Sequence, residues 1–290
     1  SFNMLYKNFE KQVEIDREYN PRFRIKDTAL LIKHFLKESE RVRCSMDHRD
    51  GIPYGVSPDE VLDFYPVTQP RSPVHCFIHG GYWHSFTSRD FAFVSEDLIH
   101  HGVAVVHFNY ALCPSVTLDE IVSQCRSALE WVYRNSAGLD IDPERISVSG
   151  HSAGGHLTGM LLATDWAGDY GIPAEPIKSA FPVSGLFDLR PFPFSWLQPK
   201  LQLTQEQVKR NSPQFLKPLC LPLTRVLVGS EESGEFIRQS EIYVEHLRHH
   251  GLDAECVMLE GENHFTLLKD FHAPGGKLVQ SILEGIEKNP

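Results

Sequence analysis

The residue best suited to nucleophilic chemistry is Ser152, which stands at the centre of a Gly-x-Ser-x-Gly pattern at residues 150–154. Residues 145–149 before it have the character of a β-strand, and residues 156–164 after it suit a helix. A serine on a sharp turn from strand to helix is a nucleophile elbow, in which the flanking glycines let neighbouring backbone approach closely. The pattern alone is common, so the prediction depends on groups that could activate Ser152.

A serine hydroxyl needs a base within hydrogen-bond reach, and that base needs a partner that orients it. With this elbow the expected chain order is serine, acid and histidine. His264 stands in a loop after the last expected strand, and Glu231 and Glu232 follow the strand before it. Because the carboxyl ends of neighbouring parallel strands lie at one edge of a sheet, these side chains can converge on Ser152. We expect His264 to accept the Ser152 proton and a glutamate to orient the imidazole.

Other residues are weaker candidates for these two roles. Asp188 is the main alternative acid because it follows the strand expected at 177–184, although a cap for the next segment is the simpler interpretation. His79, His151 and His156 lie inside motifs without occupying the position of the base. We expect these three histidines to support the local structure.

A glycine-rich loop that could stabilise an oxyanion follows the strand expected at residues 74–79. The loop reads His-Gly-Gly-Tyr-Trp over residues 79–83. We expect the backbone N–H groups of Gly80, Gly81 and Ala153 to point at the developing negative charge. Losing one such donor typically lowers kcat by roughly 10²–10³-fold, which gives a chemical reason for bare glycine backbone here.

Strand-like and helix-like segments alternate along the chain, and this pattern positions the candidate residues. It predicts an α/β fold with a mostly parallel sheet of about eight strands and helices on both faces. The first two strands could form an antiparallel start to the sheet. The expected strands are residues 41–46, 61–66, 74–79, 103–109, 145–149, 177–184, 224–228 and 254–259.

We expect residues 1–290 to form a single domain, because no internal repeat or low-complexity linker divides them. Residues 1–40 form an N-terminal extension with two helix-like segments, which could be a lid, a dimer arm or decoration. Residues 186–221 are rich in aromatic residues and prolines and interrupt the alternation. We interpret them as a small cap insertion that lies over the site.

The composition restricts the partners and the location. With 28 basic against 38 acidic residues, the chain is not expected to bind nucleic acid. No apolar run approaches the ~20 residues that a membrane span needs, and charges near the N-terminus argue against a signal peptide, so we expect a cytoplasmic protein. The six cysteines form no Cys-x-x-Cys pair, which favours reduced cysteines over disulfides or zinc.

Several segments together resemble the kynurenine formamidases, which are α/β-hydrolases that cleave the formyl amide of N-formyl-kynurenine. The resemblance runs from about residue 60 to about residue 270. It is carried by residues 79–83, 150–156, 183–189, 211–213, 228–240 and 261–265.

This resemblance implies an α/β-hydrolase fold, activity without a metal or other cofactor, and a triad of Ser152, Glu232 and His264. In the family the acid precedes a serine shortly before a Phe-x-x-Gln-Ser run, which favours Glu232 over Glu231. The family often has an aspartate at this position, and a glutamate reaches one methylene further.

The leading hypothesis is a serine hydrolase that cleaves a small formamide, most specifically N-formyl-kynurenine, through an acyl-enzyme. The alternatives are a broad carboxylesterase for short acyl esters and a non-catalytic protein that binds a ligand. The expected partner is a small-molecule substrate, with no nucleic acid or membrane, and a homodimer is left open. We expect a substrate pocket lined by Tyr82, Trp83, Phe192 and Trp196.

Overall fold

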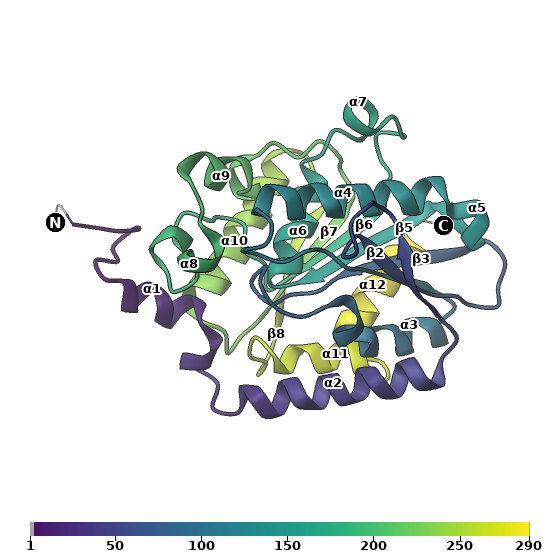
Figure 1. Ribbon diagram of the computed structural model, residues 1–290, viewed down its shortest axis with the longest axis horizontal. Helices are drawn as coiled ribbons and strands as arrows, with labels where there is room; N and C mark the ends of the chain where they lie inside the picture. Colours follow the sequence, from purple (N-terminus) through teal and green to yellow (C-terminus); the bar gives the residue numbers. More distant parts are fainter. Residues whose placement is uncertain (1–2, 290) are drawn as a thin grey trace.

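The computed structural model describes residues 3–289, and an eight-stranded sheet forms its centre (Figure 1). The strand order is β1-β2-β4-β3-β5-β6-β7-β8. Strands β1 and β2 are antiparallel to their neighbours, whereas β3 to β8 run parallel, so the predicted mostly parallel sheet is confirmed. The strands are β1 Arg49–Pro53, β2 Val61–Tyr65, β3 Ser72–Ile78, β4 Ala104–Phe108, β5 Ile141–His151, β6 Ser179–Val183, β7 Leu223–Gly229 and β8 Ala254–Leu259.

Helices cover both faces of this sheet (Figure 1). The α-helices are α1 Gln12–Tyr19, α2 Thr28–Ser45, α3 Ser95–His100, α4 Leu118–Arg134, α5 Ser136–Leu139, α6 Ala153–Leu162, α7 Trp166–Tyr170, α8 Gln198–Leu201, α9 Gln205–Arg210, α10 Gly234–His249, α11 Lys269–His272 and α12 Lys277–Glu287. The 3₁₀ helices are η1 Pro21–Phe23, η2 Ser88–Val94, η3 Phe192–Phe194, η4 Pro213–Phe215 and η5 Thr266–Leu268. No helix within residues 3–289 is long and apolar enough to cross a membrane.

Alternate side chains of the central strand β3 enter two apolar cores. Val74, Cys76 and Ile78 pack with α4, α6 and α10, whereas Phe77 packs with α3, α11 and α12. Successive side chains of a strand point to opposite faces, and a parallel sheet with helices on both sides favours apolar residues at most positions. This two-sided burial explains why the inner strands were recognisable as continuous apolar runs.

The expected strand at residues 41–46 is wrong, because most of that segment belongs to α2. Phe35, Ser39 and Val42 recur at helical spacing and are buried. The Ser39 hydroxyl donates to the Asp90 carbonyl in η2 at 2.8 Å, which fixes the helix against the body of the protein. The first strand is instead β1, which lies between α2 and β2.

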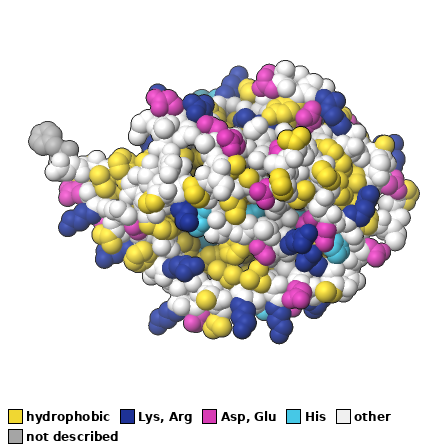
Figure 2. All heavy atoms as spheres, viewed as in Figure 1, with side chains coloured by type: hydrophobic (Ala, Val, Ile, Leu, Met, Phe, Trp, Pro, Cys, Tyr) yellow, Lys and Arg dark blue, Asp and Glu magenta, His cyan; other side chains and the backbone are white. Residues whose placement is uncertain are grey.

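The surface carries charges of both signs. Figure 2 shows acidic and basic side chains scattered over the visible face, with hydrophobic side chains gathered in the lower half of the view, above α2. The six cysteines are free, and Cys76 and Cys125 are fully buried.

Candidate active site

Ser152 lies at the turn from β5 into α6 with φ 59° and ψ −112°. Such a backbone conformation is strained for a residue with a side chain, and it exposes the hydroxyl at the carboxyl edge of the sheet. Close packing explains both flanking glycines, since a Cβ on Gly154 would overlap the Ile78 carbonyl and one on Gly150 would overlap the Gly154 carbonyl. The local sequence therefore permits the strand, the turn and the helix to meet at the serine.

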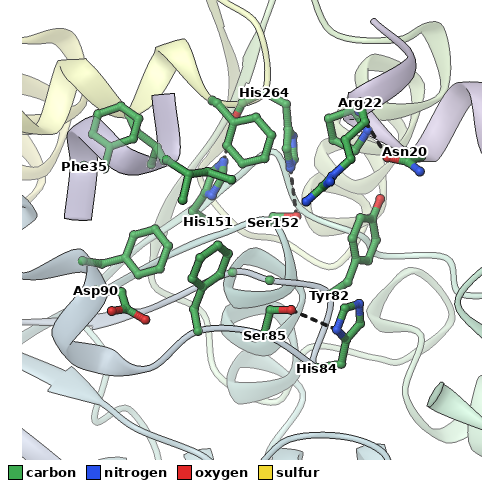
Figure 3. Close-up of a pocket in the computed structure, with 18 of the residues that line it drawn as sticks. Asn20, Arg22, Phe35, Tyr82, His84, Ser85, Asp90, His151, Ser152 and His264 are labelled. Carbon is green, nitrogen blue, oxygen red and sulfur yellow. Dashed lines mark hydrogen bonds between the residues drawn. The ribbon is translucent and has the colours of Figure 1, made fainter. Parts of the chain in front are cut away.

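The structure brings Ser152, His264 and Glu232 together in one chain of hydrogen bonds. The Ser152 Oγ lies 3.0 Å from the His264 Nε2, as the dashed line in Figure 3 marks. The His264 Nδ1 lies 2.6 Å from the Glu232 Oε1. The other carboxylate oxygen, Oε2, accepts from the Ser184 hydroxyl at 2.5 Å and from the Gly229 N–H at 2.8 Å. A carboxylate held in this way places the proton on Nδ1 and leaves Nε2 free to accept a proton from the serine.

The two competing acids lie elsewhere. Glu231 is exposed, and of the two glutamates it is Glu232 that hydrogen-bonds to His264. Asp188 is fully buried, but its carboxylate pairs with the Arg190 guanidinium at 2.7 Å and accepts from the Arg190 backbone N–H. Asp188 therefore caps the segment that follows it, which was the simpler interpretation of this residue.

The glycine loop lies directly against the elbow. A Cβ on Gly80 would lie 2.7 Å from the His151 carbonyl oxygen and 3.2 Å from the Ser152 Cβ, so only a bare backbone fits here. Ala153 is the first residue of α6, where a helix leaves N–H groups without intrahelical acceptors. Gly80 therefore stands beside Ser152 together with the N-terminus of α6, and Gly81 lines the same cavity, which is an arrangement suited to stabilising an oxyanion.

Three further histidines support the site from buried positions. The His151 Nε2 donates to the His264 carbonyl at 2.7 Å, and burial holds the pKa of His151 well below its ordinary value. The His156 Nδ1 accepts from the Trp83 indole, while its Nε2 donates to a backbone carbonyl. Burial lowers the pKa of His79 and of His156 to about 4, so both rings are neutral at pH 7. The part of the chain that the structure describes contains no cluster of His, Cys, Asp and Glu able to hold a metal ion.

A cavity of about 400 Å³ opens above Ser152, within the size range of small-molecule sites. The described residues that line it are Asn20, Pro21, Arg22, Ile32, Phe35, Leu36, Gly80, Gly81, Tyr82, His84, Ser85, Phe86, Asp90, Phe91, His151, Ser152, Trp196, His264, Phe265 and Leu268.

The expected pocket residues are only partly at the cavity surface. Tyr82 and Trp196 line the cavity, and their rings meet edge to face at 5.2 Å. Trp83 and Phe192 do not line it, so the expectation that they face the substrate needs correction. Both side chains are fully buried behind Tyr82, where burial of a large ring is most favourable.

The N-terminal extension supplies much of the cavity wall, which the sequence did not reveal. Asn20, Pro21 and Arg22 contribute from η1, and α2 adds Phe35 with two aliphatic neighbours. The helix-like segments of residues 1–40 predicted helices but not what those helices pack against. In this arrangement residues 20–22 and α2 form part of the cavity wall, and the three interpretations left open for residues 1–40 stay predictions.

Hydrogen bonds anchor this extension to elements of the site. The Tyr19 hydroxyl donates to the Glu235 carboxylate at 3.0 Å and accepts from Gln239 at 2.8 Å. The Trp196 backbone N–H donates to the Asp16 carboxylate at 3.0 Å, which joins the extension to the insertion. The position of the cavity wall is therefore fixed by buried polar contacts as well as by packing.

Comparison with known proteins places this geometry in a family. The family model BD-FAE matches residues 62–169. The chain is 33% identical over 293 residues to a kynurenine formamidase from Salmo salar, covering 95% of this chain and 97% of that protein. A crystal structure of a protein from Silicibacter sp. TM1040 matches with a TM-score of 0.82 and 27% identity over 93% of this chain and 99% of the other. An esterase from Pyrobaculum calidifontis shares the α/β-hydrolase fold, with a TM-score of 0.73 and 20% identity over 90% of this chain and 92% of that chain.

Proposed function

The chain belongs to the kynurenine formamidase family of α/β-hydrolases, and on this premise we propose that it hydrolyses an aryl formamide, most specifically N-formyl-kynurenine to kynurenine and formate. The observation that carries the proposal is the Ser152–His264–Glu232 chain of hydrogen bonds in the floor of the cavity. Aromatic side chains such as Phe35 and Phe265 in the wall suit an aryl group.

In the proposed acylation, the Ser152 Oγ attacks the formyl carbon while the His264 Nε2 takes the hydroxyl proton. The carbonyl oxygen becomes an oxyanion, which the backbone N–H groups of Gly80, Gly81 and Ala153 would stabilise. The C–N bond then breaks, His264 returns its proton to the leaving aryl amine, and a formyl ester of Ser152 remains.

In the proposed deacylation, a water molecule attacks this ester as His264 takes one of its protons. The second tetrahedral intermediate collapses, formate leaves, and the proton returns to the Ser152 oxygen. Glu232 would stabilise the imidazolium that forms twice in the cycle, because a buried charge-assisted hydrogen bond is strong.

The test compares kcat/KM for N-formyl-kynurenine with kcat/KM for p-nitrophenyl acetate. We expect efficient formamide turnover, and Ser152→Ala should abolish both activities and prevent labelling by a fluorophosphonate. Ester turnover with a negligible formamide rate would refute the proposal and favour the carboxylesterase alternative. Absence of labelling in the wild type would refute the acyl-enzyme itself.

A further inference from the structure

The cavity has two chemically different ends on either side of Ser152. Figure 3 shows Phe35 on one side of the serine and Asn20, Arg22, Tyr82 and His84 on the other. The other apolar lining residues are Pro21, Ile32, Leu36, Phe86, Phe91, Trp196, Phe265 and Leu268, of which Trp196 packs against Tyr82.

Arg22 supplies the positive charge at the polar end. Figure 3 shows its guanidinium directed into the cavity toward Ser152. Among the described residues that line the cavity, Arg22 is the one arginine or lysine. Burial lowers the pKa of His84, so that imidazole is neutral at pH 7 and adds no charge.

Neighbouring residues fix the backbone of Arg22 and leave its guanidinium free. The Arg22 backbone N–H donates to the Asn20 Oδ1 at 3.1 Å, and Pro21 begins the short helix that carries the residue. None of the ion pairs found within residues 3–289 uses the Arg22 side chain. The cavity's acidic residue, Asp90, lies on the far side of Ser152 and accepts from the Thr87 N–H at 2.9 Å.

We propose that Arg22 binds a carboxylate of the substrate and makes this cavity selective for aryl compounds that carry one. The aryl group would occupy the end near Phe35, and a carboxylate on a short side chain would reach the guanidinium across Ser152. A planar guanidinium binds a carboxylate through paired charge-assisted hydrogen bonds. The inference rests on the proposed function, because the amino-acid group of N-formyl-kynurenine carries such a carboxylate beside its α-ammonium group.

The net charge of the chain bears on how the cavity could select a carboxylate. The chain has a formal net charge of −10, so its long-range field does not favour a carboxylate group. Selectivity for a carboxylate must therefore come from a charge inside the cavity. Arg22 would act as a specificity-determining residue in binding, because the carboxylate lies away from the bond that is cleaved.

The test uses two matched aryl esters, 3-(2-acetoxyphenyl)propanoate and its uncharged methyl ester. The Arg22→Met variant keeps an apolar stem without the charge, and Arg22→Lys keeps a point charge without the planar fork. Arg17→Met is the matched control, because Arg17 is an exposed arginine of the same extension that does not line the cavity.

For Arg22→Met we expect kcat/KM for the carboxylate ester to fall by roughly tenfold to a hundredfold, chiefly through KM. The methyl ester should change by less than about twofold in this variant, and Arg17→Met should affect neither substrate. Arg22→Lys should retain part of the preference for the anion. An equal loss for both esters, or no loss for either, would overturn the inference.

Two measurements separate this inference from the proposed function. If the wild type prefers the carboxylate ester but does not cleave N-formyl-kynurenine, the formamidase proposal fails and the anion site stands. If N-formyl-kynurenine is cleaved equally well by Arg22→Met, the anion site fails and the formamidase proposal stands. If neither ester is hydrolysed, calorimetric dissociation constants for 3-phenylpropanoate and 3-phenylpropanamide answer the same question, with an unchanged ratio in Arg22→Met counting against the site.

Discussion

Replacing Glu232 by glutamine should change the tautomer of His264. In the wild type, the Glu232 Oε2 accepts from the Gly229 N–H and the Ser184 hydroxyl, while Oε1 faces the His264 Nδ1. The amide oxygen of a glutamine must remain at the Gly229 N–H, because an NH₂ group cannot accept from it. The NH₂ group then faces Nδ1 and requires that nitrogen to accept a hydrogen bond.

This reversal removes the base from Ser152. With Nδ1 as an acceptor, the proton of a neutral imidazole moves to Nε2, which lies 3.0 Å from the Ser152 Oγ and can then only donate. The same change in a catalytic triad of this geometry lowers kcat by roughly 10⁴-fold. That loss corresponds to about 5 kcal/mol of transition-state stabilisation.

The assay combines steady-state kinetics with ¹⁵N NMR of the imidazole. We expect Glu232→Gln to lose kcat with little change in KM, and the NMR spectrum to show His264 protonated at Nε2. Glu231→Gln is the matched control, because Glu231 is exposed and its neighbour makes the contact with His264. Denaturant unfolding of both variants verifies that each remains folded.

A Glu232→Gln variant that keeps more than a tenth of wild-type kcat would refute this reasoning. Retention of the Nδ1-protonated form in the NMR spectrum would refute it independently, because the side-chain amide would then have turned against the Gly229 N–H. A large loss in Glu231→Gln would instead show that charge near the loop, rather than the tautomer, controls the rate.

The other predictions address the oxyanion loop, the extension and pH. Gly80→Ala should lower kcat by roughly 10²–10³-fold without unfolding the protein, since its methyl group would displace the loop from the elbow; unchanged kcat would exclude the loop from catalysis. Tyr19→Phe removes the hydrogen bond to Glu235 and should lower the free energy of unfolding in urea by about 1–3 kcal/mol while raising KM. An unchanged KM would show that this hydrogen bond does not position the cavity wall. Burial lowers the pKa of His75 and of His107 to about 3, below the ordinary value of 6.5, so the unfolded chain binds protons first as the pH falls. The free energy of unfolding is therefore highest above pH 6.5 and declines from there toward pH 3, by at most about 1.4 kcal/mol per pH unit for each histidine. Equal free energies of unfolding at pH 7 and pH 5 would contradict this.

The sequence predicted the inner strands well because burial on two faces leaves a strong local signal. The error at residues 41–46 has a different cause. That segment is short and mixes charged with apolar residues, and its helical state depends on packing of Phe35 and Val42 against the body of the protein. Local propensity carries no information about such a contact.

The same distinction separates the catalytic geometry from the cavity. Ser152, Glu232 and His264 each follow the carboxyl end of a parallel strand, so one topological rule predicted that they could meet. Their catalytic roles stay predictions. Arg22 and Phe35 reach the cavity from an extension without a recognisable motif, and only the folded chain shows that they lie above the serine.

The turn before α10 connects the catalytic geometry with the wall of the cavity. Glu232 contacts His264, and three residues later Glu235 holds the Tyr19 hydroxyl of the extension. Ser233 caps the helix between them by accepting from the Phe236 N–H. A displacement of this turn would move both the group that orients the imidazole and the support for the segment that carries Arg22. The residues proposed to activate the serine and the segment that carries the residue proposed to select its substrate are therefore positioned by the same short loop.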